Sequence, residues 1–306
     1  MMSPREVARL LPRSPGVYRF RGDGGRVLYI GRATDLRSRV GSYWGDLEDR
    51  RHLRRMVPLI VRVEAVACAS VHEAAWLERN LLQAAKPRWN RVRGGMETAT
   101  VVLLDGRERT AGLRIAYDDA APLADGVLRF GPYLGGLRTR GALAALHRVH
   151  PIAYCGSALT ASERELGAVL GVADTDRLAM AKDLAAILAR DPAAVEACAR
   201  DLIELRDRAA ACLRFEVAAQ INEELDALAW ITSTQRVATL SGDDAMAHGW
   251  ADGTLVTLAI TAGRLSKWSQ ARCTEGRGAA LVAATPQAWQ SFASDAAVLA
   301  VSLVTV

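Results

Sequence analysis

The sequence predicts an α+β protein. A small N-terminal α/β domain, with helices flanking a central mixed or antiparallel sheet, should precede a mainly helical region and a small β-rich C-terminal part. Three observations carry this prediction. A glycine-rich turn joins two β-patterned segments near residue 22, residues 162–230 are rich in Ala, Leu, Glu and Arg, and β-patterning returns after residue 232. We therefore expect four parts, 1–95, 96–160, 161–232 and 233–306.

The first part is expected to alternate short helices and strands. Pro12 and Pro15 end the first helix, and Gly22-Asp23-Gly24-Gly25 predicts a hairpin between two strands. Apolar residues at helical spacing predict the helix that ends before Pro87. In chain order the expected elements are helix 3–11, strands 16–20 and 26–30, helix 35–44 capped by Thr34 or Asp35, a basic helix over 50–59, strand 61–69 and helix 72–85.

The remaining elements follow from the same patterns. Strands are expected at 99–105 and 113–117, and a helix over 138–150, before the helical stretch. After residue 232, alternation of apolar and polar residues predicts strands at 236–240, 254–260 and 298–305, with a helix near 286–294.

Composition excludes several classes of protein. Of the 306 residues, 50% are hydrophobic and 24% charged, as in soluble globular proteins. No apolar run approaches the roughly 20 residues of a membrane span, so no membrane partner is expected. The five cysteines are scattered, which fits a reducing cytoplasm better than a disulfide framework.

Charge is distributed unevenly along the chain. Residues 1–95 contain 19 basic and 9 acidic residues, a net charge of +10, whereas the rest of the chain has a net charge of −5. A basic segment of this size predicts contact with a polyanion.

The first ninety residues combine groups that phosphodiester hydrolysis uses. If the four-residue loop closes simply, Tyr18 lies directly opposite Tyr29 on the hairpin. Arg39 and Tyr43 are four residues apart, on one helix face, and Glu78 is a lone acid on an apolar turn. Phenols, a guanidinium and a carboxylate can supply a base, a cation for developing charge and an oxygen ligand for a metal. By spacing alone, the same residues fit packed strand tyrosines, a solvated arginine and a surface carboxylate.

The order and identity of the residues in these segments favour the catalytic interpretation over the structural one. Pro15-Gly16-Val17-Tyr18 followed by Leu28-Tyr29-Ile30-Gly31-Arg32-Ala33 resembles the GIY-YIG nuclease signature. The form found in the UvrC family is matched by four further segments: Asp35-Leu36-Arg37-Ser38-Arg39, Ser42-Tyr43, Glu73-Ala74-Ala75-Trp76-Leu77-Glu78 and Lys86-Pro87-Arg88-Trp89-Asn90. The match is ordered and spans about 75 residues.

The resemblance implies a role for each matching residue. Tyr18 and Tyr29 would be the active-site tyrosines, and Glu78 would hold one divalent ion, Mg²⁺ or Mn²⁺. Arg39 and Tyr43 would bind the scissile phosphate, and Asn90 would help to hold the site or the DNA. Gly31 would allow close approach of the backbone to phosphate. Backbone phosphates of DNA would be contacted by Arg37, Arg50, Arg51, Arg54, Arg55, Lys86 and Arg88.

Position 32 departs from the family, which usually has lysine where this chain has Arg32. A guanidinium, with a pKa above about 12, cannot take part in proton exchange with a phenol, although its charge can favour tyrosinate. Tyrosinate and a metal-activated water therefore both stay open as the base, with the water favoured.

The resemblance continues beyond the first part. Phe130-Gly131-Pro132-Tyr133 is similar to a UvrC segment after which the family often has a four-cysteine iron–sulfur cluster. Only Cys155 stands near that place, so no cluster is expected. Residues 209–220 resemble the UVR hairpin by which UvrC docks on UvrB, with Phe215 as the apolar anchor, although Ile221-Asn222-Glu223 replaces the family's Leu-Arg-Asp.

The resemblance as a whole implies a short UvrC homologue of the Cho type, without the RNase-H-like and helix-hairpin-helix domains. It would be a cytoplasmic, nucleoid-associated endonuclease that nicks damaged double-stranded DNA on the 3′ side of a lesion, leaving a 5′ phosphate and a 3′ hydroxyl. UvrB, loaded by UvrA, would bind the hairpin at 205–230. Two alternatives stay open: a nuclease that acts without UvrB, and a non-catalytic DNA-binding scaffold.

Overall fold

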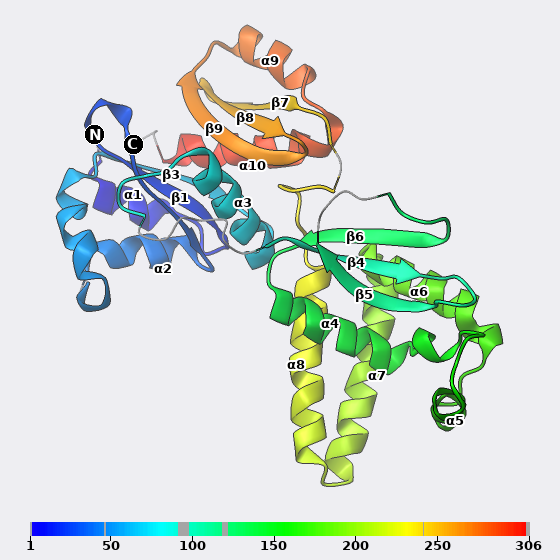
Figure 1. Cartoon of the computed structure of the whole chain (residues 1–306). Coiled ribbons are helices and arrows are strands. Elements are labelled where there is room, and N and C mark those ends of the chain that lie inside the picture. The colour runs from blue at the N-terminus through cyan, green and yellow to red at the C-terminus, as the bar shows by residue number, and fades with distance from the viewer. Residues whose placement is uncertain (1, 46, 91–97, 118–121, 241, 304–306) are drawn as a thin grey trace. The chain divides into compact units, whose positions relative to one another are not determined.

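The computed structural model describes all residues except 1, 46, 91–97, 118–121, 241 and 304–306. The chain groups into two compact units (Figure 1). One unit joins the N-terminal segment, Met1–Glu97, to the C-terminal segment, Thr234–Val306, and the other is formed by Thr98–Ser233. Helices and strands are both present in each unit, as the predicted α+β class requires.

The first unit contains a three-stranded antiparallel sheet in the order β2-β1-β3. Its strands are β1 (Gly16–Arg21), β2 (Val27–Ala33) and β3 (Arg62–Ala67). The predicted hairpin register is wrong, because Tyr18 pairs with Gly31, and Tyr29 pairs with Phe20. Gly24 and Gly25 both adopt positive φ in a tight turn, and a bulge follows Phe20, so β2 is shifted by two residues relative to a simple loop.

Three helices cover this sheet, and each begins at a residue whose side chain accepts a backbone N–H. They are α1 (Pro4–Leu10), capped by Ser3, α2 (Leu36–Gly41), capped by Asp35, and α3 (Val71–Ala84), capped by Ser70. The predicted helix 35–44 continues past α2 only as a 3₁₀ turn over Ser42–Trp44. The caps are local signals, which is why the starts of these helices were predictable.

The prediction of a basic α-helix over 50–59 is wrong, because this segment is 3₁₀-helical. The chain forms 3₁₀ segments over Glu48–Arg55 and Val57–Leu59. Four arginines within six residues repel one another in a regular helix, and Pro58 removes a backbone donor.

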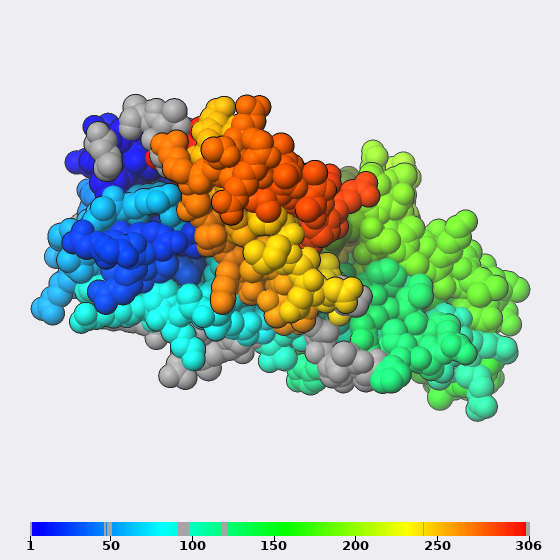
Figure 2. All heavy atoms as spheres, turned by 90° about the horizontal axis from the view of Figure 1, so that it is seen from above, coloured from blue at the N-terminus to red at the C-terminus, as the bar shows by residue number. Residues whose placement is uncertain are grey.

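The C-terminal segment of this unit is a second antiparallel sheet with two helices. Its strands are β7 (Ala245–Ala251), β8 (Thr254–Thr261) and β9 (Arg264–Arg272), and its helices are α9 (Glu275–Ala283) and α10 (Gln287–Ser302). The strand predicted at 254–260 is confirmed, whereas residues 236–240 form only an isolated bridge, between Ala238 and Arg264. Figure 2 shows this orange-to-red segment packed beside the blue and cyan N-terminal residues.

The strand predicted at 298–305 is wrong as far as the structure describes it. Residues up to Ser302 belong to α10, and 304–306 lie outside the described residues. Phe292, Ala293, Ala296, Ala297 and Ala300 are buried on one face of that helix, at spacings of three and four residues. The short run of apolar residues at 298–301 suggested a strand, whereas the helical period is visible only over the longer segment.

Among the residues that the structure describes, the second unit packs five helices with one antiparallel sheet, in the order β5-β4-β6. The strands are β4 (Thr100–Asp105), β5 (Gly112–Tyr117) and β6 (Val127–Tyr133), and the helices are α4 (Gly136–Val149), α5 (Ala161–Val169), α6 (Arg177–Leu188), α7 (Pro192–Ala211) and α8 (Phe215–Thr232). Leu104, Leu146, Leu184, Leu202 and Leu228 share its core. Prediction missed β6, whose end is the segment Phe130–Tyr133.

Candidate active site

Three phenols from three different elements meet beside β1. Tyr18 lies on β1, Tyr29 on β2 and Tyr43 on the 3₁₀ turn after α2. The Tyr18 and Tyr43 hydroxyls share a hydrogen bond of 2.8 Å, and the Tyr29 ring centroid lies 6.2 Å from that of Tyr18 and 6.0 Å from that of Tyr43. Tyr18 and Tyr43 are buried, whereas Tyr29 is half-buried. Tyr29 is therefore the phenol of this cluster that is most open to a ligand.

Burial raises the pKa of all three phenols above their ordinary value. Arg39 opposes this rise at each phenol, because its positive charge favours tyrosinate. Without a further cation the three hydroxyls are therefore neutral near neutral pH, and they act as hydrogen-bond donors and acceptors.

Arg39 extends from α2 toward this cluster. Its guanidinium carbon lies 6.0 Å from the ring centroid of Tyr43. The Arg39 Nε atom is buried and has no hydrogen-bond acceptor among the described residues. A buried N–H without an acceptor is costly. An anion bound beside the phenols would supply the missing acceptor.

Glu78 reaches the same sheet from α3. Its carboxylate accepts a hydrogen bond of 3.1 Å from the Arg32 backbone N–H and lies 3.3 Å from Arg32 Nε. Burial raises the pKa of Glu78 above its usual value, and the charge of Arg32 opposes that rise. The arginine that departs from the family pattern is thus paired with the carboxylate.

Gly31 and Asn90 fix the shape of β2 at this point. The Asn90 side chain accepts from Ile30 N at 3.1 Å and donates to Ile30 O at 2.7 Å, so it covers the free edge of the strand. A Cβ atom at Gly31 would lie 2.5 Å from Tyr18 Oη and 2.8 Å from Tyr29 Cε1. Gly31 lies within β2, and its close neighbours in the structure are phenol rings.

The opposite side of α3 is anchored by a residue that sequence reasoning missed. Glu73 is fully buried and accepts hydrogen bonds from Arg236 N (2.7 Å), Nε (3.0 Å) and Nη2 (3.1 Å). Asn80 also donates to the Val237 carbonyl at 3.2 Å. The helix that carries Glu78 is therefore held between the sheet and the C-terminal segment. No local signal could have shown this, because Glu73 and Arg236 are 163 positions apart.

We expect Arg236→Met to lower the free energy of unfolding by roughly 3 kcal/mol, because it leaves the Glu73 carboxylate buried without its cation. Chemical denaturation measures this change. Asp295→Asn is the matched control, since it removes the other ion pair of Arg236, a 3.7 Å contact to a carboxylate that is 65% exposed. Equal effects of the two variants would contradict the assignment of the stabilisation to Glu73.

The predicted DNA-contacting residues lie mainly on the surface of this unit. Arg51, Arg54, Arg55, Lys86 and Arg88 are exposed. The Arg37 Nε atom donates to the Leu11 carbonyl at 2.7 Å. The Arg50 side chain lies outside the described residues. Phe215 belongs to the other unit, where it begins α8 and is 64% exposed.

The single carboxylate at the site, that of Glu78, fits the binding of one divalent ion. Among the described residues, no cluster of three or more His, Cys, Asp or Glu side chains could hold a metal. The Glu78 carboxylate offers one hard oxygen donor, and Arg39, whose charge acts on that carboxylate, has a buried Nε without an acceptor among the described residues. Mg²⁺ commonly binds proteins through one or two carboxylates, completing its shell with waters and phosphate oxygens.

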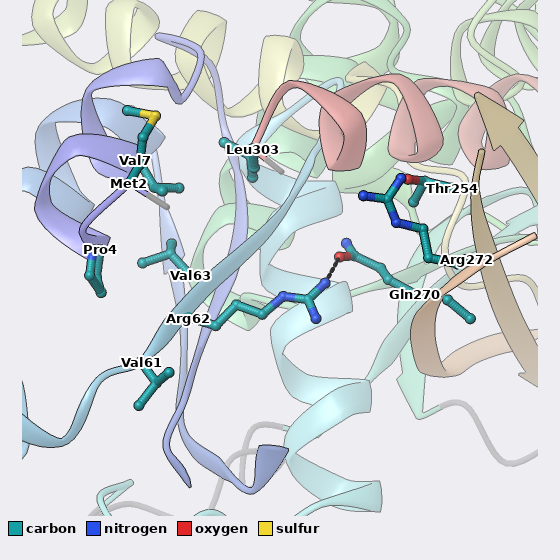
Figure 3. Close-up of a pocket in the computed structure, with 11 residues that line it drawn as sticks. Met2, Pro4, Val7, Val61, Arg62, Val63, Thr254, Gln270, Arg272 and Leu303 are labelled. Atoms are coloured by element: carbon teal, nitrogen blue, oxygen red, sulfur yellow. Dashed lines mark hydrogen bonds between the residues drawn. The ribbon is translucent and has the colours of Figure 1, made fainter. Parts of the chain in front are cut away.

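A separate cavity of about 410 Å³ lies beside β3 (Figure 3). Val7, Val63 and Leu303 line its apolar side, and Arg62 Nη2 donates to Gln270 Oε1 at 2.9 Å across it. Neither the three phenols nor Glu78 line this cavity. The side chains of the candidate active site therefore lie at the β2 edge, away from this cavity.

None of the helices that the structure describes has the length and apolarity to span a bilayer.

Comparisons with known proteins match part of this chain to one family of domains. Residues 14–91 match the family model of the UvrC-like GIY-YIG domain. UvrABC system protein C of Desulforudis audaxviator is 30% identical over 279 residues, covering 86% of this chain and 44% of that protein. The protein of the same name from Geobacter metallireducens is 36% identical over 145 residues, covering 47% of this chain and 23% of that protein. The chain thus spans less than half the length of these relatives.

A solved structure is also similar over the same part of the chain. It is the GIY-YIG N-terminal endonuclease domain of UvrC from Thermotoga maritima, bound to magnesium as its catalytic divalent cation. It is 31% identical, with a TM-score of 0.26, and the match covers 28% of this chain and 93% of that chain.

Proposed function

We propose that the chain is a divalent-metal-dependent endonuclease that nicks one strand of DNA, because residues 14–91 match the family model of the UvrC-like GIY-YIG domain. The observation that carries the proposal is the meeting of three phenols, Arg39 and Glu78 at one end of β2. The relatives are named for the UvrABC system, which supports a role in nucleotide excision repair. The cut would fall on the 3′ side of a lesion.

Glu78 would hold the ion, which when bound supplies Lewis-acid stabilisation of charge on the phosphate and activation of a water. The reaction adds the oxygen of water to phosphorus and breaks the bond from phosphorus to the 3′ oxygen, leaving a 3′ hydroxyl and a 5′ phosphate. Arg39 would pair with a non-bridging oxygen, since its buried Nε has no acceptor among the described residues.

The phenols would organise the phosphate and the water. Tyr18 and Tyr43 are buried and bonded to each other, so they hold the arrangement rigid. Tyr29, the most accessible of the three, would exchange a proton with the water or the leaving oxygen. Its raised pKa keeps this phenol protonated in the free protein, so a metal-bound water would be favoured over tyrosinate as the base.

We further propose that the α7–α8 hairpin docks on UvrB after UvrA has loaded it on damaged DNA, in the cytoplasm at the nucleoid. Leu213 and Phe215 flank the turn and are 74% and 64% exposed. Apolar side chains exposed together on a helical turn are typical of partner-binding surfaces.

The test uses an end-labelled duplex with one bulky adduct and Mg²⁺ or Mn²⁺, with and without UvrA and UvrB. Wild type is compared with Phe215→Ala. A nick 3′ of the adduct that needs UvrB and is lost in Phe215→Ala supports the whole proposal. Metal-dependent nicking that ignores UvrB keeps the nuclease and removes the repair role. DNA binding without cleavage under all conditions contradicts the nuclease and favours a scaffold.

Cleavage is expected to fall as pH is lowered, with a midpoint above that of an ordinary glutamate. Burial raises the pKa of Glu78, and a protonated carboxyl cannot bind the metal. Arg32→Met should move this midpoint to still higher pH, because Arg32 lowers the pKa of Glu78. A pH–rate profile at a fixed metal concentration measures both effects. A midpoint that stays in place or falls in Arg32→Met would contradict this coupling.

A further inference from the structure

A second pocket, of about 380 Å³, opens beside the N-terminal half of β2. Its walls come from that strand, from Leu59 and from the chain that follows α3. The volume lies within the range of small-ligand pockets, roughly 300–1,000 Å³. Neither a catalytic tyrosine nor Glu78 lines it, so it is distinct from the candidate active site.

The lining of this pocket combines an aromatic and aliphatic interior with a cationic rim. Trp89, Pro87, Leu28, Val27 and Leu59 supply the apolar surface. Three further lining side chains are cationic and exposed: Arg26, Lys86 and Arg88. No aspartate or glutamate lines the pocket, and in the part of the chain that the structure describes none of these cations forms an ion pair.

The position of Trp89 is fixed by the backbone. Its N–H donates to the Leu28 carbonyl at 3.3 Å. The side-chain amide of the next residue, Asn90, accepts from the Ile30 N–H and donates to the Ile30 carbonyl. Trp89 remains half-buried, with the Arg88 guanidinium carbon 5.7 Å from its ring centroid. A rigid, partly open indole with cations beside it is suited to stacking a nucleobase whose phosphates need partners.

The pocket is also close to the candidate active site along the strand. Leu28 in the pocket directly precedes Tyr29, and one strand residue advances about 3.3 Å. Successive nucleotides of one DNA strand advance by a similar length, 3.4 Å per nucleotide in the duplex. Because successive strand side chains point to opposite faces of the sheet, a DNA strand whose phosphate lies at the phenols would pass around the free edge of β2, where Trp89 N–H is bonded to Leu28 O, to place a nearby base at Trp89.

We propose that this pocket binds one unstacked nucleotide of the DNA strand, with its base against Trp89 and its phosphates paired with Lys86, Arg88 and Arg26. The ligand class rests on the proposed function, which supplies DNA as the substrate. A site of this kind would make the protein prefer DNA that contains an unpaired nucleotide over a fully paired duplex.

Binding without cleavage tests this proposal, using the full chain in EDTA. The probe is a single-stranded oligonucleotide with one 2-aminopurine, whose fluorescence is quenched on stacking. Wild type should quench the probe, and Trp89→Leu should weaken single-strand binding about tenfold. Binding of a fully paired duplex should change by less than about twofold, because no base is free to stack.

The cationic rim is tested separately with Lys86→Gln combined with Arg88→Gln. Removing two phosphate contacts should weaken binding and lower the slope of log affinity against log salt by about 1.4 on single strands. Arg5→Gln combined with Arg9→Gln removes the same charge from exposed positions on α1 and should leave both quantities unchanged.

A measurement with unaltered protein guards against misfolding of the variants. Replacing the 2-aminopurine nucleotide by an abasic one should weaken wild-type binding as much as Trp89→Leu does. If abasic and ordinary strands bind equally, or if Trp89→Leu weakens duplex and single-strand binding alike, the proposal is overturned. Nicking of a plasmid with Mn²⁺ is measured in parallel. If stacking is observed but nicking is absent, only the proposed nuclease function is overturned. If nicking is observed but stacking is absent, only the proposed nucleotide pocket is overturned.

Discussion

Glu78→Gln is expected to reduce metal-dependent cleavage by roughly a hundredfold or more, because an amide cannot replace an anionic ligand of the divalent ion. The fold should be preserved, since glutamine keeps an acceptor for the Arg32 backbone N–H and the Arg32 side chain is half exposed. Single-turnover cleavage of labelled DNA across a range of Mn²⁺ concentrations measures the loss.

Glu165→Gln is the matched control, because it makes the same change of charge at an exposed position on α5. It should cleave at the wild-type rate. Wild-type cleavage by Glu78→Gln would show that the ion is held elsewhere.

Arg39→Ala is expected to lower the single-turnover rate by about a hundredfold to a thousandfold, with a smaller change in DNA affinity. The reason is that a cation placed where charge develops stabilises the transition state more than bound substrate. Arg39 Nε donates no hydrogen bond among the described residues, so the variant loses mainly the side-chain interaction with the Tyr18 hydroxyl and should remain folded. Cleavage rates at saturating DNA, with the melting temperature, provide the measurement.

Two variants sharpen this result. Arg39→Lys should recover part of the rate, because it restores the charge without the planar fork. Arg13→Ala removes an exposed arginine from the same unit and should behave as wild type. If Arg39→Ala weakened binding and left the saturated rate intact, Arg39 would be a binding residue with no role in the transition state.

Much of the local structure could be predicted because it depends on neighbours in sequence. Ser70 caps α3 through the backbone N–H of Glu73, three residues away, and Asp35 caps α2 in the same way. The helical character of residues 162–230 follows from their richness in Ala, Leu, Glu and Arg, which favour helix. The residue types of the candidate site were likewise readable from the motifs that contain them.

Other features depend on packing between distant segments. The predicted register of β1 and β2 differs from the observed one by two residues, because the turn geometry and a bulge determine the register. One face of the sheet must also bury Tyr18 beside Phe20. The apolar run at the end of the described chain became helix because its alanines pack against β7 and β8. Local propensity is too weak to outweigh such burial.

By itself, then, the sequence determined the starts of α1, α2 and α3, the α+β class and the identity of the phenols, Arg39 and Glu78. Only the tertiary structure decided that burial keeps the phenols neutral, that Arg32 pairs with Glu78, and that Arg236 anchors α3 through Glu73. Caps and helical periods arise from contacts within a few residues. Burial, electrostatic shifts and ion pairs across 163 positions exist only once the chain has folded.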